Sequence, residues 1–185
     1  MAKVVWIVNY YTATPEKVSN PRYLQMAHYF MKGGYKVITF NHTFKGEKIF
    51  QRRQYGEYDF VHVKSPCYVG NGLKRMYSIW KFAQTLNNHC KEFEKPDIVL
   101  QNIHPPFDYP IVKMTKRLEA KYIAEAWDLW PDNFAVYGLM SRNNPIMKVA
   151  YQIEKYYYYA ADEIVFTFKG AFDYLKNKGW TTETG

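Results

Sequence analysis

The 185-residue sequence has little cysteine and no long hydrophobic run. Cys67 and Cys90 are its only cysteines, and they do not have the spacing of a metal site. Two free thiols are typical of a protein in a reducing cytosol. No apolar run approaches the roughly 20 residues of a membrane span, and the opening MAKVVWIVNY is typical of a first strand rather than a signal peptide. We therefore expect a soluble, cytoplasmic protein of one domain.

Glycine is missing from the first loop, YYTATPEKVSN at 10–20. A loop that holds a phosphate normally needs glycine, because the backbone amides must approach the anion closely. The motif GxGxxG is also absent, which argues against a standard dinucleotide site. Arg22, in the first turn of the following helix, can supply a charged contact instead, or it can simply be solvated.

What the sequence does have is an alternation of short β-branched runs with stretches of helical periodicity. This order predicts right-handed crossovers and a mostly parallel sheet, which is an α/β domain with helices on both faces. We expect strands at 4–9, 35–40, 58–63, 97–103, 121–126 and 163–167. We expect helices at 21–32, 73–93, 108–118, 145–160 and 169–178.

The loops that follow parallel strands all meet at the carboxyl edge of the sheet, where such domains bind ligands. Two candidate catalytic residues fall in these loops. His104 follows the fourth strand in NIHPPF and can act as a general acid or base, or be a loop histidine bonded to backbone. Asp128 follows the fifth strand in EAWDLWPDN and can bind a sugar hydroxyl, or only stabilise the turn. Of Trp127 and Trp130, we expect one to cover the site and the other to pack inward.

Basic residues are concentrated in one part of the chain. The net charge is +8, and 43–82 holds eight basic and three acidic residues, which leaves +5 there. A local positive field attracts phosphates, nucleic acid or an anionic membrane, and it can also be a solvated face. We expect an anion or membrane patch at Lys45, Lys48, Arg52 and Arg53. The segment YVGNGLKR at 68–75 is a second candidate, either an anion-binding loop or a glycine-rich helix entry.

Five stretches in a fixed order carry a resemblance. They are NPRYLQMAHYFMKGGYKVITF, YVGNGLKRMYSIWKFA, DIVLQNIHPP, EAWDLWPDN and YQIEKYYYYAADEIVFTFKGAFDYLKNKG. With them the chain resembles the N-terminal, acceptor-side domain of GT-B fold glycosyltransferases of family 4, of the type that builds bacterial surface polysaccharide and O-antigen. The resemblance implies a Rossmann-like three-layer domain of about six or seven strands over residues 1–185. It also implies a second, donor-binding domain, whose acidic E-x7-E motif has no match here.

The resemblance implies roles for three of the candidate residues, His104, Asp128 and Arg22. His104 matches the histidine that contacts the donor sugar, and Asp128 falls in the DLWP motif at the cleft. Two departures stand out: the first loop lacks the glycines of many relatives, and Trp127 replaces the usual arginine before DLWP. Arg22 occupies a position where many members carry arginine. Together with the YVGNGLKR segment and the two tryptophans, the predicted substrate-binding residues are Arg22, Asn71, Lys74, Arg75, Trp127 and Trp130.

The implied reaction is transfer of a hexosyl group from a nucleotide-sugar donor to a saccharide hydroxyl, with retained configuration. Basic side chains and helix N-termini can meet the phosphate charge, so we expect no metal and no other cofactor. A lipid-linked saccharide is the implied acceptor, which would place the protein on the inner face of the membrane. The alternative is a non-catalytic module that binds an anionic membrane or a lipid-linked saccharide. We expect no nucleic-acid partner, since no such motif occurs.

Overall fold

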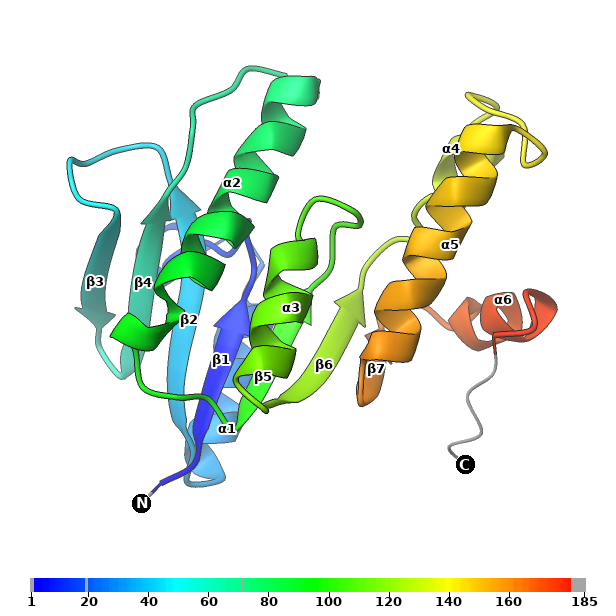
Figure 1. The fold of residues 1–185 in the computed structure, drawn as a ribbon. Helices are drawn as coiled ribbons and strands as arrows, with labels where there is room; N and C mark the ends of the chain where they lie inside the picture. Colours follow the sequence, from blue (N-terminus) through cyan, green and yellow to red (C-terminus); the bar gives the residue numbers. More distant parts are fainter. Residues whose placement is uncertain (1, 19, 71, 181–185) are drawn as a thin grey trace.

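The computed structural model describes residues 2–18, 20–70 and 72–180. It is an α/β domain built on a seven-stranded sheet, with strand order β3-β4-β2-β1-β5-β6-β7 (Figure 1). Every neighbouring pair is parallel except β3 and β4. The predicted mostly parallel sheet of about six or seven strands is therefore confirmed.

The strands are β1 (Val4–Val8), β2 (Lys36–Thr43), β3 (Phe50–Tyr55), β4 (Tyr58–Lys64), β5 (Ile98–Asn102), β6 (Lys121–Ala126) and β7 (Glu163–Phe166). The helices are α1 (Arg22–Lys32), α2 (Leu73–His89), α3 (Tyr109–Arg117), α4 (Asp132–Val136), α5 (Pro145–Ala160) and α6 (Ala171–Asn177). Two short 3-10 turns occur at Pro15–Lys17 and Cys90–Glu92.

Apolar side chains on both faces of the central strands create the three layers. Trp6 and Phe40 point to one face and pack in a cluster with Phe82 of α2 and Ile111 of α3. Val5 and Ile7 belong to a second cluster with Tyr23 and Ala27 of α1. Figure 1 shows the same division, with α2 and α3 on one side of the sheet and α1 on the other.

Two elements were not expected. The edge strand β3 has the polar sequence FQRRQY, in which no apolar alternation marks a strand. It forms by antiparallel pairing with β4, and Arg52 reaches across to Asp59. The short helix α4 follows the turn at Trp130 and Pro131, where the sequence suggested only a loop.

The predicted helix at 73–93 is too long. α2 ends at His89, and the chain continues as a 3-10 turn to Glu92. Cys90 and Phe93 still pack against the core, which explains why their apolar spacing looked helical.

The strand order reverses at β1, which lies between β2 and β5. In open parallel sheets a crevice forms at such a switch point, beyond the carboxyl ends of the strands. The loops after β1 and β5 border this point, and the loop after β6 lies next to them. We therefore expect the ligand-binding site to lie among these loops.

Candidate functional site

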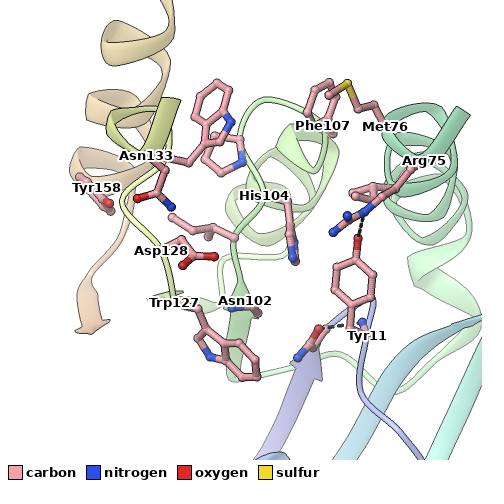
Figure 2. A pocket seen from close by; sticks show the side chains of 15 residues that line it. Tyr11, Arg75, Met76, Asn102, His104, Phe107, Trp127, Asp128, Asn133 and Tyr158 are labelled. Carbon is pink, nitrogen blue, oxygen red and sulfur yellow. Dashed lines mark hydrogen bonds between the residues drawn. The ribbon is translucent and has the colours of Figure 1, made fainter. Parts of the chain in front are cut away.

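A cavity of about 400 Å³ opens at the carboxyl edge of the sheet. Its walls come from the loops after β1, β5 and β6 and from the first turns of α2 (Figure 2). His104 and Asp128 both line it, and their side chains point toward the same space. The structure therefore brings together the two residues that the sequence analysis proposed as catalytic.

His104 is held by a buried carboxylate. Its backbone N–H donates to Asp108 Oδ2, and its ring Nδ1 lies 3.5 Å from the same oxygen. The Tyr157 hydroxyl donates to the other oxygen, Asp108 Oδ1, at 2.9 Å. Asp108 and Tyr157 are buried, whereas the His104 side chain keeps 22% of its surface exposed. One ring edge of His104 is thus anchored and the other remains available to a ligand.

Asp128 stands at the junction of two hollows. It lines the cavity with His104, and it also lines a more open hollow with Asn20, Arg22 and Gln25. The carboxylate is exposed, so it can accept a hydrogen bond from a bound molecule. A carboxylate in this place can orient a hydroxyl group from either hollow.

Both tryptophans of the EAWDLWPDN turn line the cavity. Trp127 is 37% exposed and stacks on the Tyr23 ring, with centroids 5.8 Å apart and planes at 14°. Trp130 is half-buried on the opposite part of the same turn. The expected division into one covering and one core tryptophan does not occur, because the turn directs both rings to the cavity.

Arg75 supplies the positive charge closest to the cavity wall. Its Nε donates to the Tyr11 hydroxyl at 2.6 Å, and its guanidinium lies 5.1 Å from the centre of that ring. Burial raises the pKa of Tyr11, although the hydrogen bond from Arg75 opposes this change. Tyr11 therefore stays a neutral hydroxyl that fixes the cation at the cavity.

Arg22 lies beside the second hollow and pairs with Glu125. Its Nε lies 2.5 Å from Glu125 Oε1, and Tyr23 donates its hydroxyl to the other carboxylate oxygen. Glu125 is completely buried at the end of β6. The sequence analysis does not predict this pair. The one acid in the otherwise apolar run YIAEA is the feature that could have indicated a buried ion pair.

The remaining predicted residues lie away from the cavity or outside the described residues. Lys74 is exposed in the first turn of α2, and Asn71 lies outside the described residues. Lys45 and Lys48 are exposed between β2 and β3. Arg52 lies 2.6 Å from Asp59 and 3.2 Å from Glu94, so two acids compensate its charge. Arg53 is exposed on β3.

A second polar network connects α4, α5 and α6. Asp132 is buried and accepts hydrogen bonds from Arg142 and from Tyr151. Nearby, the buried Glu154 accepts from Tyr158 at 3.1 Å and from Tyr174 at 2.7 Å. Burial raises the pKa of Glu154 to about 8. Asp132 is thus a structural residue of this network.

Within the part of the chain that the structure describes, no three histidine, cysteine, aspartate or glutamate residues are grouped as a metal ion would require. Over the same residues, none of the helices is both long and apolar enough to span a bilayer.

No family model matches the sequence, and no curated protein matches it. Solved structures do match over nearly the whole chain. A sucrose-phosphate synthase from Thermosynechococcus elongatus aligns with a TM-score of 0.63 and 10% identity, over 99% of this chain and 46% of its own. An alpha,alpha-trehalose-phosphate synthase (UDP-forming) from Burkholderia vietnamiensis gives 0.58 and 11%, over 99% and 45%.

A third match is an E. coli trehalose-6-phosphate protein bound with UDP-2-fluoro glucose. It aligns with a TM-score of 0.59 and 9% identity, over 95% of this chain and 43% of its own. The chain thus spans less than half the length of these proteins. At such low identity the similarity concerns the fold. This chain has the fold of one Rossmann-like half of a GT-B glycosyltransferase.

Proposed function

We propose that this chain is the acceptor-side half of a retaining glycosyltransferase, which moves a hexosyl group from a nucleotide sugar to a saccharide hydroxyl. The observation that carries the proposal is the shared cavity of His104 and Asp128 at the switch point of the sheet. An imidazole and a carboxylate that face one space suit a donor sugar on one side and an acceptor hydroxyl on the other. A neighbour of the same fold was solved with UDP-2-fluoro glucose, which supports a nucleotide-sugar donor.

In this proposal each residue has one task. His104 contacts the donor sugar near the reacting carbon, and Asp128 orients the acceptor hydroxyl. Arg75 and Lys74 offer positive charge to phosphate at the start of α2, and we keep Asn71, which lies outside the described residues, as a neutral hydrogen-bonding group for the substrate. Trp127 and Trp130 provide flat apolar walls for a sugar ring. Arg22 borders the second hollow, where its pair with Glu125 holds the guanidinium in place for a substrate. Positive side chains would meet the phosphate charge, so no metal is assigned to the reaction.

The acceptor that we propose is a lipid-linked saccharide, as the resemblance to family 4 enzymes implies. The named products of the structural neighbours are sugar phosphates. A lipid-linked saccharide and a sugar phosphate each present a hydroxyl close to an anionic group. The cations at the start of α2 suit either of them as acceptor. A lipid-linked acceptor would place the protein at the membrane, on its cytoplasmic face.

Residues 1–185 would form the N-terminal domain, and a second domain would hold most of the donor. Catalysis would then depend on closure of the two domains over the substrates. We expect the 185-residue chain alone to transfer no sugar, and the two-domain protein to transfer it from a nucleotide sugar. The assay is incorporation of radiolabelled sugar into a lipid extract or a sugar phosphate.

His104→Ala in the two-domain protein should lower turnover by about 100-fold or more. His28→Ala is the matched control, because His28 is an exposed histidine on α1. Turnover of the His104→Ala variant equal to that of the wild type would refute the catalytic assignment.

A non-catalytic module that binds a membrane is the second candidate. It is favoured by one specific observation, the exposed apolar side chains at the start of α2 and at the start of α5.

A further inference from the structure

Two of the stretches that line the cavity contain no acidic residue. The first runs from 60 to 91 and contains five lysines and arginines. The second runs from 133 to 153 and contains Arg142 and Lys148. The first stretch contains most of β4 and all of α2, and the second contains most of α4 and the first turns of α5. An anionic surface would therefore meet no negative charge from these segments.

The same stretches expose large apolar side chains. We call six of them the apolar rim: Val69, Leu73, Tyr77, Leu139, Ile146 and Val149. Their exposed fractions are 97%, 82%, 52%, 71%, 67% and 61%, in that order. Soluble proteins do expose single apolar residues, but clusters of them mark a binding surface. The aliphatic members form no hydrogen bonds through their side chains, so only removal from water can stabilise them.

The two groups of the rim lie at the same edge of the domain. α2 follows the parallel strand β4, and α5 runs back along the sheet after β6, so both N-termini lie at the carboxyl edge. Figure 1 shows the two helices projecting past the sheet in the same direction. The cavity opens at this edge too, since Arg75 and Met76 of α2 form one wall and Trp130 and Asn133, at the start of α4, form another. The rim and the cavity thus lie at the same edge of the sheet.

We propose that the apolar rim is a docking surface for an anionic lipid bilayer. Aliphatic and aromatic side chains enter the interface between headgroups and acyl chains, and neighbouring lysines attract anionic headgroups. Lys74 and Lys81 on α2 and Lys148 on α5 are exposed and suit this second role. The stacked pair of Tyr77 and Trp80, with ring centroids 5.8 Å apart, is typical of side chains at a membrane interface.

Other partners fit the rim less well. Nucleic acid would use the cations and the aromatic rings, but it offers nothing to Val69, Leu73, Ile146 and Val149. The loop cations between β2 and β3 are a poorer membrane surface, because Glu47 lies between Lys45 and Lys48 and Arg52 is paired with acids. The rim rests on the second candidate of the proposed function, the membrane-binding module, and gives it a surface. It does not depend on sugar transfer, since membrane binding can be measured without any sugar substrate.

The test is vesicle flotation of the 185-residue chain. The vesicles are phosphatidylcholine alone, or phosphatidylcholine with roughly 30% phosphatidylglycerol. We expect binding to the anionic vesicles that weakens in high salt, and much weaker binding to the neutral ones. Val69→Glu with Leu73→Glu should weaken binding about tenfold, and Ile146→Glu with Val149→Glu should do the same. These side chains are exposed, so thermal unfolding should be unchanged.

The matched control is Tyr29→Glu with Ile49→Glu, which adds the same charge at exposed apolar positions away from the rim. It should bind vesicles like the wild type, as should Lys45→Glu with Lys48→Glu. Equal binding by the rim variants and the wild type would overturn the proposal. Equal binding to neutral and anionic vesicles would overturn it as well. So would a loss of vesicle binding in the Lys45→Glu, Lys48→Glu variant alone. Rim-dependent binding of an oligonucleotide without vesicle binding would also overturn it. A rim-dependent dimer that ignores vesicles would also overturn it.

Discussion

The imidazole Nδ1 of His104 lies 3.5 Å from the carboxylate of Asp108, and that carboxylate also accepts the backbone N–H of the same histidine. Asp108 lies at the start of α3, and its second carboxylate oxygen accepts a hydrogen bond from Tyr157 of α5. The histidine is therefore tied to two helices as well as to β5. Its ring is oriented before any ligand binds, which lowers the cost of ordering it during a reaction.

Replacing Asp108 should disturb His104 without touching the ligand. We expect Asp108→Asn to lower kcat in the two-domain protein by about tenfold and to change KM little, because only the ring orientation is lost. The second readout is the tautomer of His104, measured from the ¹⁵N shifts of its ring in the 185-residue chain. Asp173→Asn, an exposed acid on α6, is the control. An unchanged tautomer together with unchanged turnover would remove Asp108 from this role.

Arg22 should matter first for stability. Removing it leaves the buried Glu125 carboxylate with Tyr23 as its remaining partner, so Arg22→Ala should lower the free energy of unfolding by about 2 kcal/mol. Adding Glu125→Gln should recover part of this loss, because a neutral amide tolerates burial better than an unpaired carboxylate. Urea unfolding of the two single variants and the double variant measures the coupling. Arg53→Ala, an exposed arginine on β3, is the control, and an equal loss in it would argue against the buried pair.

Glu154 should make the protein less stable as the pH rises. Burial raises the pKa of this carboxyl to about 8, above its usual 4.5, so the folded state retains a proton that the unfolded chain releases. Stability is then highest below the unfolded pKa and falls by at most about 1.4 kcal/mol per pH unit up to the folded pKa. Tyr158, Tyr174 and Lys178 oppose this shift.

Glu154→Gln should remove this pH dependence. The measurement is the free energy of unfolding of both proteins between pH 5 and pH 8, a window set by the raised pKa near 8. The difference between the two curves should change steadily across the window. Parallel curves would show that Glu154 is not the group that binds the proton.

Asp132 should have the opposite dependence on pH. The Arg142 guanidinium and then the Tyr151 hydroxyl hold the pKa of Asp132 below its usual 3.8, while burial acts against them. Its stabilising effect is present above 3.8 and is lost as the pH falls through the lower folded pKa. Asp132→Ala should cost about 2 kcal/mol near neutral pH, because the buried Tyr151 hydroxyl loses its acceptor. Calorimetry at neutral and acid pH measures this cost, and it should be smaller in acid. A cost that did not shrink in acid would point to packing alone.

Local signals predicted most of the elements. Asn144 and Pro145 indicated the start of α5, and the Asn144 side chain does accept from the backbone N–H of Ile146. β3 could not be predicted in this way. Its sequence has no apolar face, and only pairing with β4 makes it a strand. α4 likewise depends on its surroundings, since Asp132 in its first turn is held by Arg142 and Tyr151.

The amino-acid sequence alone determined that strands and helices alternate, and this order brings the loops of His104 and Asp128 to one edge. Parallel strands joined by right-handed crossovers leave no other arrangement. Only the tertiary structure decided which polar groups meet: Asp108 with Tyr157, and Arg22 with Glu125, which is 103 positions away. Such pairs depend on the distance between side chains after packing, and no local periodicity encodes that distance.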